Sequence, residues 1–488
     1  MTFKQYINEK NYYVYILVIA FIFLAMPYFI RMLGHGYMMI PGDKSYNHLT
    51  ISETSFSNST LMFQTVNDPL IVPSRAQIVT PYHILLAGLG NLFPSAAVIV
   101  VLAILLGITT LFLFDRILAR FGFEYFERFV MAILLVMSPL FLSTYLIPDQ
   151  IYFAIFLQLL GFYLYTCTKK GYIKYFSLLP YALLSLFSII HTLIAILILF
   201  AYEYVSGKKY RFLLMLSAIM LGICLYYNFP VYFVYGFIKA KISSGNFYIS
   251  YLGSKNGFGI FTLLLLLFGI IGTWHEKYTK NYSWIYLLMC SLIVLTLFYP
   301  FYMPYLNFVV VIFAGLGFLY LFKMRWEFKI IKNFTILIII LGILFSGVSF
   351  VKIASYMPPS EELVQALEKI KQEYHQDIVI LSHPDYGHII KYFASRKVLI
   401  DSSQDFIEDY DYYASVTNTI FQSRSLSEVS DLLTRYNIKL ILITKEMKNG
   451  LVWERENKGL LFLLDNSDKF KPIYYTHNVE IWEFDNNH

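Results

Sequence analysis

Residues 42–48 carry the polar side chains with the clearest capacity for chemistry. They read Gly-Asp-Lys-Ser-Tyr-Asn-His and follow a long apolar stretch. Asp43 is suited to act as a general base or as a metal ligand, and Tyr46 and His48 are close enough in sequence to bind a substrate beside it. A helix cap or a solvated loop carboxylate would give the same pattern.

A second acid, Asp149, follows Pro148 at a short turn between two apolar stretches. It can cap the helix that begins at the next residue, where a negative charge favours the helix dipole. If Asp43 and Asp149 lie on one face of a membrane, the two carboxylates can also hold a divalent cation or supply a general base. The metal would be Mg²⁺ or Mn²⁺, because the ligands are hard oxygens and the sequence has no Cys/His cluster.

Arg75 and His83 stand between these two acids. Arg75 can clamp a phosphate, or it can contact lipid headgroups or a loop carboxylate. His83 is a candidate ligand or a hydrogen-bonded structural residue. Residues 82–93 are apolar but too short to span a membrane, so an interfacial helix is expected there.

Asp385 and Tyr386 lie in the stretch His-Pro-Asp-Tyr-Gly-His, between a predicted strand and a predicted helix. Loops at the carboxyl ends of strands commonly bind substrates in α/β domains. Asp385 can instead cap the helix expected to start at Tyr386.

The composition indicates that these residues belong to a polytopic membrane protein. Of the 488 residues, 58% are hydrophobic and 14% are charged, and the mean hydropathy is +0.58. A soluble chain carries more charge and less apolar content. The net charge is +6, and the Lys and Arg residues fall mostly in short loops between apolar stretches. Basic residues in such loops set the orientation of a membrane protein, so we expect no nucleic-acid partner.

A membrane-spanning helix needs about 20 apolar residues. We predict about 11 such helices, counting residues 173–205 as a two-helix hairpin that turns near His191. The others are expected near residues 12–31, 95–114, 129–146, 150–167, 210–228, 258–274, 284–299, 303–322 and 333–351.

The loop charges predict a cytoplasmic N-terminus. In that orientation the basic loops are cytoplasmic, as the positive-inside rule requires; they are residues 115–128, 169–174, 207–211, 275–280 and 323–332. The long first loop, 34–94, the turn at Asp149, the loop 230–257 and the C-terminal residues then lie outside the cell. Lys239, Lys241 and Lys255 of the loop 230–257 depart from the rule, which long loops obey poorly. We predict the plasma membrane of a prokaryote as the location.

Two domains are expected. Residues 1–356 form a transmembrane domain with its long outer loop, and residues 357–488 form an extracytoplasmic α/β domain. In the second domain, helices are expected near 361–374, 386–394, 408–421 and 426–436, and strands near 378–381, 397–400, 439–444, 471–476 and 479–484. It has no glycine-rich phosphate loop.

The order of these features resembles the GT-C superfamily of integral membrane glycosyltransferases, which use lipid-phosphate-linked sugars on the extracytoplasmic side. The resemblance is carried by residues 42–46 in a long first outer loop, residues 80–86 late in that loop, and Pro148-Asp149 at the next outer turn. Residues 385–387 and 396–401 are similar to the Trp-Trp-Asp-Tyr-Gly region of the oligosaccharyltransferase catalytic subunit family. Lys44 and the pair His383-Pro384 depart from those patterns.

The resemblance implies transfer of a sugar or oligosaccharide from a polyprenyl-phosphate-type carrier to a protein, glycan or lipid acceptor. Asp43 would be the general base or, with Asp149, a metal ligand. Arg75 and His83 would hold the lipid phosphate, and the remaining substrate-binding residues would be Tyr46, His48, Asp385 and Tyr386. Membrane lipids would surround the spans.

Two other functions stay open. A transporter or flippase usually has charges and broken helices near the middle of the bilayer, whereas the polar residues of this chain gather at one predicted face. A non-catalytic scaffold with an outer binding domain would not need Asp43 or Asp149.

Overall fold

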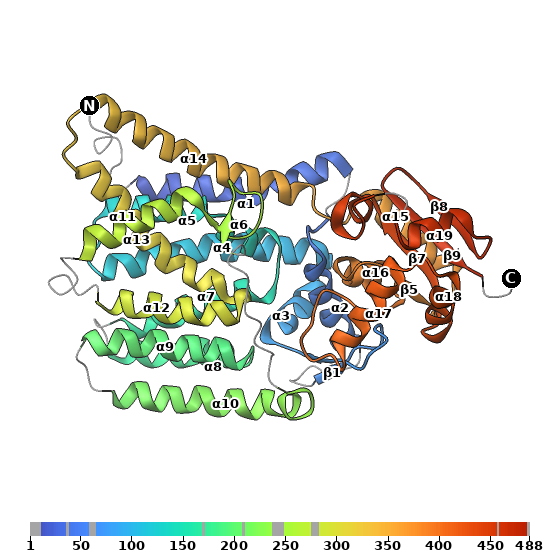
Figure 1. Cartoon of the computed structure of the whole chain (residues 1–488). Coiled ribbons are helices and arrows are strands. Elements are labelled where there is room, and N and C mark those ends of the chain that lie inside the picture. Colours follow the sequence, from blue (N-terminus) through green and yellow to red (C-terminus); the bar gives the residue numbers. More distant parts are fainter. Residues whose placement is uncertain are drawn as a thin grey trace. The chain divides into compact units, whose positions relative to one another are not determined.

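The computed structural model describes residues 11–35, 39–57, 65–167, 171–206, 210–236, 248–274, 283–455 and 458–485. The chain forms two compact units (Figure 1). Unit 1 comprises residues 1–38, 97–229 and 239–355, and unit 2 comprises residues 39–96, 230–238 and 356–488. Unit 2 therefore combines the first predicted loop with the C-terminal residues, although these segments are far apart in sequence.

Unit 1 is helical and apolar. Five described helices are long and apolar enough to cross a membrane: α1 (Tyr12–His35), α4 (Ser95–Arg120), α10 (Arg211–Tyr235), α13 (Met303–Lys323) with the preceding turn η4 (Pro300–Tyr302), and α14 (Lys329–Ser355). A sixth candidate span is the pair α5 (Tyr125–Val136) and α6 (Pro139–Leu146), which is bent by 60°. The bend falls at Pro139, which has no N–H to continue a helix.

Shorter helices complete unit 1. They are α7 (Gln150–Tyr165), η2 (Gly171–Ser177), α8 (Leu178–Ser185), α9 (Ile189–Ser206), α11 (Ile260–Trp274) and α12 (Ser283–Phe298), with a two-residue strand pair, β3 (Ile249–Ser250) and β4 (Phe258–Gly259). The break between α8 and α9 lies at residues 186–188, just before His191. The helices are those of a multi-pass membrane protein, and the total of about 11 spans stays a prediction.

Helices α11 and α13 of unit 1 pack closely at two glycines. A Cβ atom added to Gly269 would collide with the carbonyl oxygen of Phe313, and one added to Gly317 would collide with that of Leu265. Small residues allow this approach of two backbones in a membrane bundle.

The core of unit 2 is a five-stranded sheet with the order β6-β5-β7-β9-β8. Strand β5 (Val379–Leu381) is parallel to β6 (Lys397–Val398) and to β7 (Ile438–Thr444). Strand β9 (Val479–Phe484) is antiparallel to β7 and to β8 (Phe470–Tyr475). The carboxyl ends of the three parallel strands therefore share one edge of the sheet.

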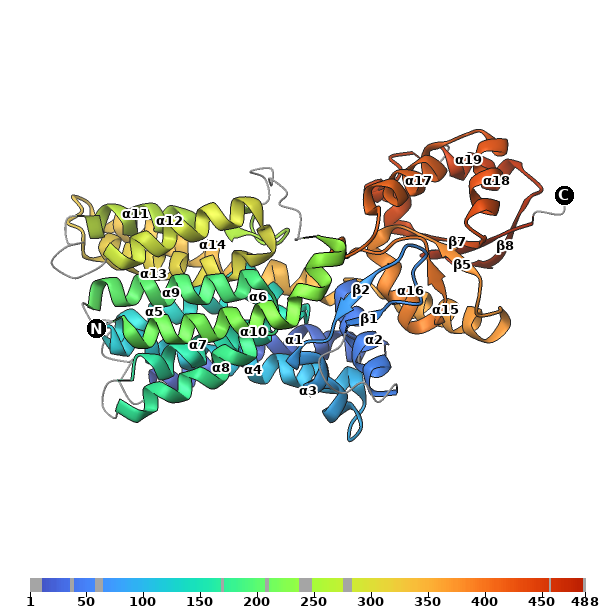
Figure 2. The ribbon, with the colours of Figure 1, turned by 90° about the horizontal axis from the view of Figure 1, so that it is seen from below.

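Helices cover both faces of this sheet. In Figure 2, α15 (Glu361–Glu373) and α16 (Gly387–Ala394) lie on one side, and α17 (Tyr410–Gln422), α18 (Leu426–Arg435) and α19 (Leu460–Asn466) lie on the other. The turn η5 (Pro384–Tyr386) precedes α16, and η6 (Met447–Leu451) follows β7. The sequence patterns predicted neither α19 nor η6.

The first loop is part of the same unit. It forms α2 (Asp43–Ser57), the antiparallel pair β1 (Thr65–Asn67) and β2 (Ala76–Ile78), and α3 (Pro81–Gly90). Ile71 bridges Val398 at the outer strand of the sheet, and the Ala76 N–H donates to the Phe406 carbonyl at 3.2 Å. These backbone contacts bring the polar residues of the first loop close to the polar residues that follow strands β5 and β6.

Candidate functional site

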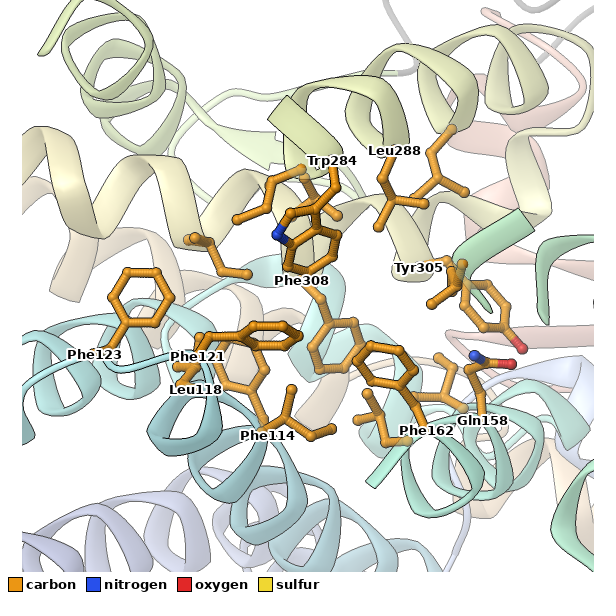
Figure 3. Close-up of a pocket in the computed structure, with 18 residues that line it drawn as sticks. Phe114, Leu118, Phe121, Phe123, Gln158, Phe162, Trp284, Leu288, Tyr305 and Phe308 are labelled. Atoms are coloured by element: carbon orange, nitrogen blue, oxygen red, sulfur yellow. The ribbon is translucent and has the colours of Figure 1, made fainter. Parts of the chain in front are cut away.

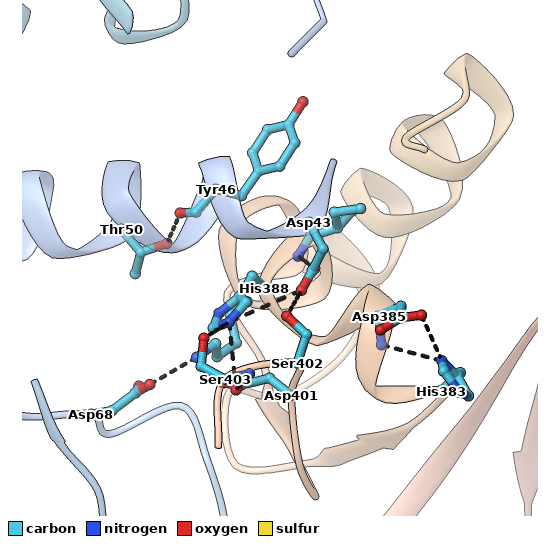
Figure 4. A network of polar contacts seen from close by, with 12 residues as sticks. Asp43, Tyr46, Thr50, Asp68, His383, Asp385, His388, Asp401, Ser402 and Ser403 are labelled. Carbon is cyan, nitrogen blue, oxygen red and sulfur yellow. Dashed lines mark hydrogen bonds and ion pairs between the residues drawn. The ribbon is translucent and has the colours of Figure 1, made fainter. Parts of the chain in front are cut away.

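Asp43 lies at the first residue of α2 and is held by two donors from the C-terminal segment (Figure 4). The Ile389 N–H donates to its Oδ1 at 2.9 Å, and the Ser402 hydroxyl donates to its Oδ2 at 2.7 Å. Gly42, at a left-handed φ of 86°, turns the chain into α2, and its N–H donates to the Pro358 carbonyl at 2.9 Å. Both carboxylate oxygens of Asp43 thus have a partner.

The glycine of the Asp-Tyr-Gly motif has a steric role at this site. A Cβ atom added to Gly387 would collide with the Cβ of Asp401 and lie 2.7 Å from its Cα. Only glycine lets the start of α16 approach the segment after β6 so closely. The Ile389 N–H is one of the first-turn donors of α16 without a partner inside the helix, and Asp43 supplies that partner from α2.

Four charged side chains lie beside Asp43. Lys391 donates to Asp68 and to Asp401, each at 2.7 Å, and Arg75 donates to Asp401 at 2.5 Å and lies 3.8 Å from Asp68. We call the six residues Asp43, Asp68, Arg75, His388, Lys391 and Asp401 the buried ion cluster; none of them is more than 9% exposed.

The charges of the cluster balance each other. Burial alone would raise the pKa of Asp401, but Arg75, His388 and Lys391 together hold that pKa far below its usual value. Asp401 is therefore ionised, and with Asp68 it matches the two cations Lys391 and Arg75. This pairing offsets the cost of removing four charges from water.

Asp43 differs from the other acids of the cluster. Burial raises its pKa to about 8, although the bonds from Ser402 and Ile389 favour the ionised form. The carboxyl group thus holds a proton at neutral pH and releases it in mildly alkaline solution. A group that titrates close to the working pH is suited to proton transfer.

His388 lies between the acids. Its Nε2 is 2.9 Å from the Ser403 hydroxyl, 3.4 Å from Asp401 Oδ1 and 4.0 Å from Asp43 Oδ2. Burial lowers the pKa of His388 well below its usual value, so the ring is neutral. Its Nδ1 is buried and has no hydrogen-bond partner among the described residues.

His48 and His83 form a hydrogen-bonded pair of imidazoles in unit 2. His48 Nδ1 and His83 Nε2 are 2.9 Å apart, and the Thr80 N–H donates to His83 Nδ1 at 3.0 Å. Because His83 Nδ1 accepts that bond, its Nε2 carries the hydrogen and donates to His48. The two imidazoles connect α2 to the first turn of α3.

Tyr46 contacts protein groups through both its hydroxyl and its ring. Its hydroxyl donates to the Ile40 carbonyl at 3.1 Å and receives a bond from the Ile40 N–H at 3.3 Å. Its ring packs against Tyr392 and Phe393 of α16. In this conformation Tyr46 fixes the entry to α2.

Asp385 and Tyr386 lie at the shared edge of the parallel strands. The Tyr386 hydroxyl accepts a bond from Thr444 at 2.9 Å and donates to Glu446 at 3.1 Å. Asp385 has a side chain that is 61% exposed and lies 3.5 Å from His383 Nδ1. Asp385 is therefore accessible to a ligand, and Tyr386 is anchored.

Asp149 belongs to unit 1, at the N-cap position of α7. It acts electrostatically on His191 of α9, whose Nδ1 is 2.8 Å from the Tyr305 hydroxyl. Asp149 and Asp43 lie in different units, so their predicted pairing stays a prediction.

Unit 1 contains an apolar cavity (Figure 3). Phe114, Phe121, Phe162, Trp284 and Phe308 contribute aromatic walls. Figure 3 shows the polar ends of Gln158 and Tyr305 on the same side of this cavity. The cavity is suited to hydrocarbon and has no charged lining residue.

The residues around Asp43 do not fit a divalent metal in this conformation. The cations Lys391 and Arg75 are both bound to the neighbouring acid Asp401, which leaves that carboxylate paired and not available to share a metal with Asp43. Among the residues that the structure describes, no three His, Cys, Asp or Glu side chains are grouped to hold a metal ion. The proposal of Mg²⁺ or Mn²⁺ therefore gains no support from unit 2.

Sequence reasoning did not select four residues of the site: Asp68, Lys391, Asp401 and Ser402. Lys391 sits on a helix whose apolar positions gave no sign of a buried cation. Asp401 directly follows a predicted strand and could have been identified by the rule for carboxyl ends of strands. Ser402 carried no signal of its own.

No protein-family model matches the sequence, and no curated protein matches it. Solved structures do share its fold. An oligosaccharyltransferase from Archaeoglobus fulgidus in the apo form has a TM-score of 0.63 at 12% identity, and the match covers 90% of this chain and 70% of that one. The same organism's AglB, in complex with an inhibitory peptide and a dolichol-phosphate, has a TM-score of 0.60 at 12% identity, again over 90% and 70% of the two chains.

ArnT from Cupriavidus metallidurans bound to undecaprenyl phosphate has a TM-score of 0.54 at 11% identity, and the match covers 94% of this chain and 97% of that one. These proteins are GT-C glycosyltransferases. At such low identities the similarity establishes the fold alone. The resemblance predicted from the sequence is thus confirmed at the level of the GT-C fold.

Proposed function

We propose that this chain is a membrane glycosyltransferase that transfers a sugar or oligosaccharide from a polyprenyl-phosphate-type carrier to a protein or glycan acceptor at the extracytoplasmic face. One observation carries the proposal. The fold extends over 94% of this chain and 97% of ArnT, a protein whose structure holds undecaprenyl phosphate. AglB, with the same fold, was solved with a dolichol-phosphate and a peptide.

The make-up of unit 2 supports chemistry on one side of the membrane. Residues 39–96 and 356–488 belong to one compact unit, so we infer that the first loop and the C-terminal residues share one side of the bilayer. With a cytoplasmic N-terminus, that side is extracytoplasmic. Asp43, Arg75, His83 and Asp385 would then all lie on the same side of the membrane.

In the proposed reaction, an O–H or N–H group of the acceptor attacks the anomeric carbon of the sugar. The bond from that carbon to the phosphate oxygen breaks, and its electron pair leaves on the lipid phosphate. Asp43 in its ionised form takes the proton of the acceptor, which it can do because it titrates near pH 8. Asp149 would support the positive charge that develops on the sugar ring. No step is assigned to a metal.

Arg75 and His83 would bind the departing phosphate. Arg75 is paired with Asp401 at 2.5 Å, so a phosphate would have to share or replace that carboxylate. The apolar cavity of unit 1 would accommodate part of the prenyl chain. Asp385, the exposed acid at the strand edge, would contact the acceptor, whereas Tyr46, His48 and Tyr386 are buried and would support the site behind it.

The experiment uses the purified full-length protein in lipid nanodiscs. A polyprenyl-phosphate-linked radiolabelled sugar is offered with peptide and glycan acceptors, and the same sugar linked to a nucleotide serves as the control donor. We expect label to reach an acceptor from the lipid-linked donor only. Failure to cleave any lipid-linked sugar would contradict the proposal, and movement of the intact donor across a vesicle membrane would instead identify a flippase.

A further inference from the structure

We propose that Ser402 is a positioning residue for Asp43: its hydroxyl orients the Asp43 carboxylate and stabilises the ionised form that accepts the proton. This inference rests on the proposed function, in which Asp43 is the general base. Nothing in the sequence distinguished Ser402 from the other serines of the chain, so the assignment comes from geometry.

Two donors fix the plane of the Asp43 carboxylate. Ser402 Oγ lies 2.7 Å from Oδ2, and the Ile389 N–H lies 2.9 Å from Oδ1. The two donors bind different oxygens, so the group cannot rotate without losing one bond. Each oxygen keeps a further lone pair for a substrate proton, because a carboxylate has about four acceptor sites. A hydroxyl bond to a carboxylate is charge-assisted and is stronger than a bond between neutral groups.

The neighbours of Ser402 hold it in place. Asp401, the preceding residue, is bound by Arg75 and Lys391, and its Oδ1 accepts a bond from the Ser403 N–H at 3.0 Å. The Ser403 hydroxyl is 2.9 Å from His388 Nε2. The ion pairs of Asp401 and the bond from the Ser403 N–H therefore anchor the backbone on both sides of Ser402 without the Ser403 hydroxyl, and the Ser402 hydroxyl is directed at Asp43 (Figure 4).

Two groups beside Asp43, Asp401 and His388, keep their charge state when Asp43 titrates. Asp401 is held in its ionised form and His388 in its neutral form. Further groups on the surrounding elements are Lys391 on α16, Asp68 and Arg75 from the first loop, and Lys44 and His48 on α2. Burial raises the pKa of Asp43 to about 8 and the Ser402 bond lowers it, so the titration of Asp43 is the one that the Ser402 substitutions should move.

The first test is the pH dependence of sugar transfer in four proteins: wild type, Ser402→Ala, Ser402→Thr and Ser403→Ala. Transfer by the wild type should rise as pH passes about 8, because Asp43 must lose its proton to act as a base. Loss of the Ser402 hydroxyl should move this midpoint upward by about one pH unit. Ser402→Thr should restore it, and Ser403→Ala should leave it in place, since that hydroxyl binds His388.

The second test needs no substrate. The melting temperature of each protein is measured from about pH 5 to about pH 10, a range that spans the expected titration of Asp43. For the wild type, the decline of stability with rising pH should end near pH 8; in Ser402→Ala it should end about one pH unit higher. The inference is overturned if both midpoints stay at the wild-type value in Ser402→Ala. A shift in melting without any sugar transfer would contradict the proposed function and leave the positioning role standing.

Discussion

The two units of this molecule bury polar groups in different ways. In unit 1 the central bonds join neutral groups, such as His191 with Tyr305, and Ser138, which donates to Asn307 at 3.0 Å. Its buried ion pairs, for example Asp115 with Arg128 at 3.1 Å, lie near helix ends. Unit 2 instead gathers three acids, two cations and a histidine in one cluster.

This difference bears on function. Transporters usually bind substrates among polar groups and broken helices at the middle of the bilayer. In the described part of this chain, the helices of unit 1 line an apolar cavity, and the buried ion cluster with Asp43 belongs to unit 2. The comparison favours chemistry at a membrane face, with the bundle serving the hydrocarbon part of a substrate.

The largest loss of stability is expected from Lys391→Met. The substitution removes one of the two cations that contact both Asp68 and Asp401, and breaking a buried ion pair costs about 3–5 kcal/mol. Denaturant unfolding of the protein in detergent measures the change. Lys369→Met is the matched control, since Lys369 forms only an exposed pair with Glu373, and a change of similar size in the control would contradict the role given to the cluster.

A smaller loss is expected in unit 1 from Gly317→Ala. The new methyl group would meet the backbone of α11, and overpacking of this kind costs about 1–3 kcal/mol. Gly222→Ala in α10 is the control, because the structure has open space at that position. Thermal unfolding should separate the two variants; equal melting temperatures would show that the glycine contact does not hold the helices together.

The pH dependence of stability is the next effect. The folded pKa of Asp43, about 8, lies above its unfolded value, so the protonated carboxyl favours the folded state. That contribution is complete below the unfolded pKa and is lost as pH rises through about 8. The pKa of Asp401 is shifted in the opposite direction, so the stability that its ionised form contributes is lost in acid. Asp43→Asn should remove the decline in stability that ends near pH 8, and a persisting decline would assign it to another group.

The smallest effect on stability is expected from Asp385→Asn. Asp385 is 61% exposed, and its contact with His383 is a surface pair worth about 0–1 kcal/mol. A loss of sugar transfer in this variant at an unchanged melting temperature would therefore report acceptor binding. Unchanged transfer and an unchanged KM for the acceptor would remove Asp385 from the site.

Much of the local structure could be predicted from the sequence, because periodicity and turn residues act over short distances. Strand β9 has the predicted bounds, 479–484, and helix α15 begins at Glu361 after the Ser360 cap, as expected. Asp43 was identified because it follows an apolar stretch with Tyr46 and His48 close behind it. Its partners Ile389 and Ser402 were not, since a hydrogen bond across more than 300 residues leaves no mark in a single sequence.

The role of Gly387 illustrates the same limit. The Asp-Tyr-Gly motif was recognised by its resemblance to a family, and no sequence pattern explained its glycine. The explanation is the contact with Asp401, which depends on how α16 and the segment after β6 pack. Lys391 likewise reads as a surface residue of a short helix, and its burial follows from the carboxylates of Asp68 and Asp401.

The most direct test compares sugar transfer by wild type, Asp43→Asn and Asp468→Asn, with a polyprenyl-phosphate-linked donor at pH 9. Asp468 is an exposed acid of the same unit, so its variant controls for the loss of one carboxylate. We expect Asp43→Asn to be slower by about 10²–10⁴ at an unchanged fold, the usual contribution of a general base, and Asp468→Asn to retain wild-type activity. Equal transfer rates for all three proteins would contradict the assignment of Asp43.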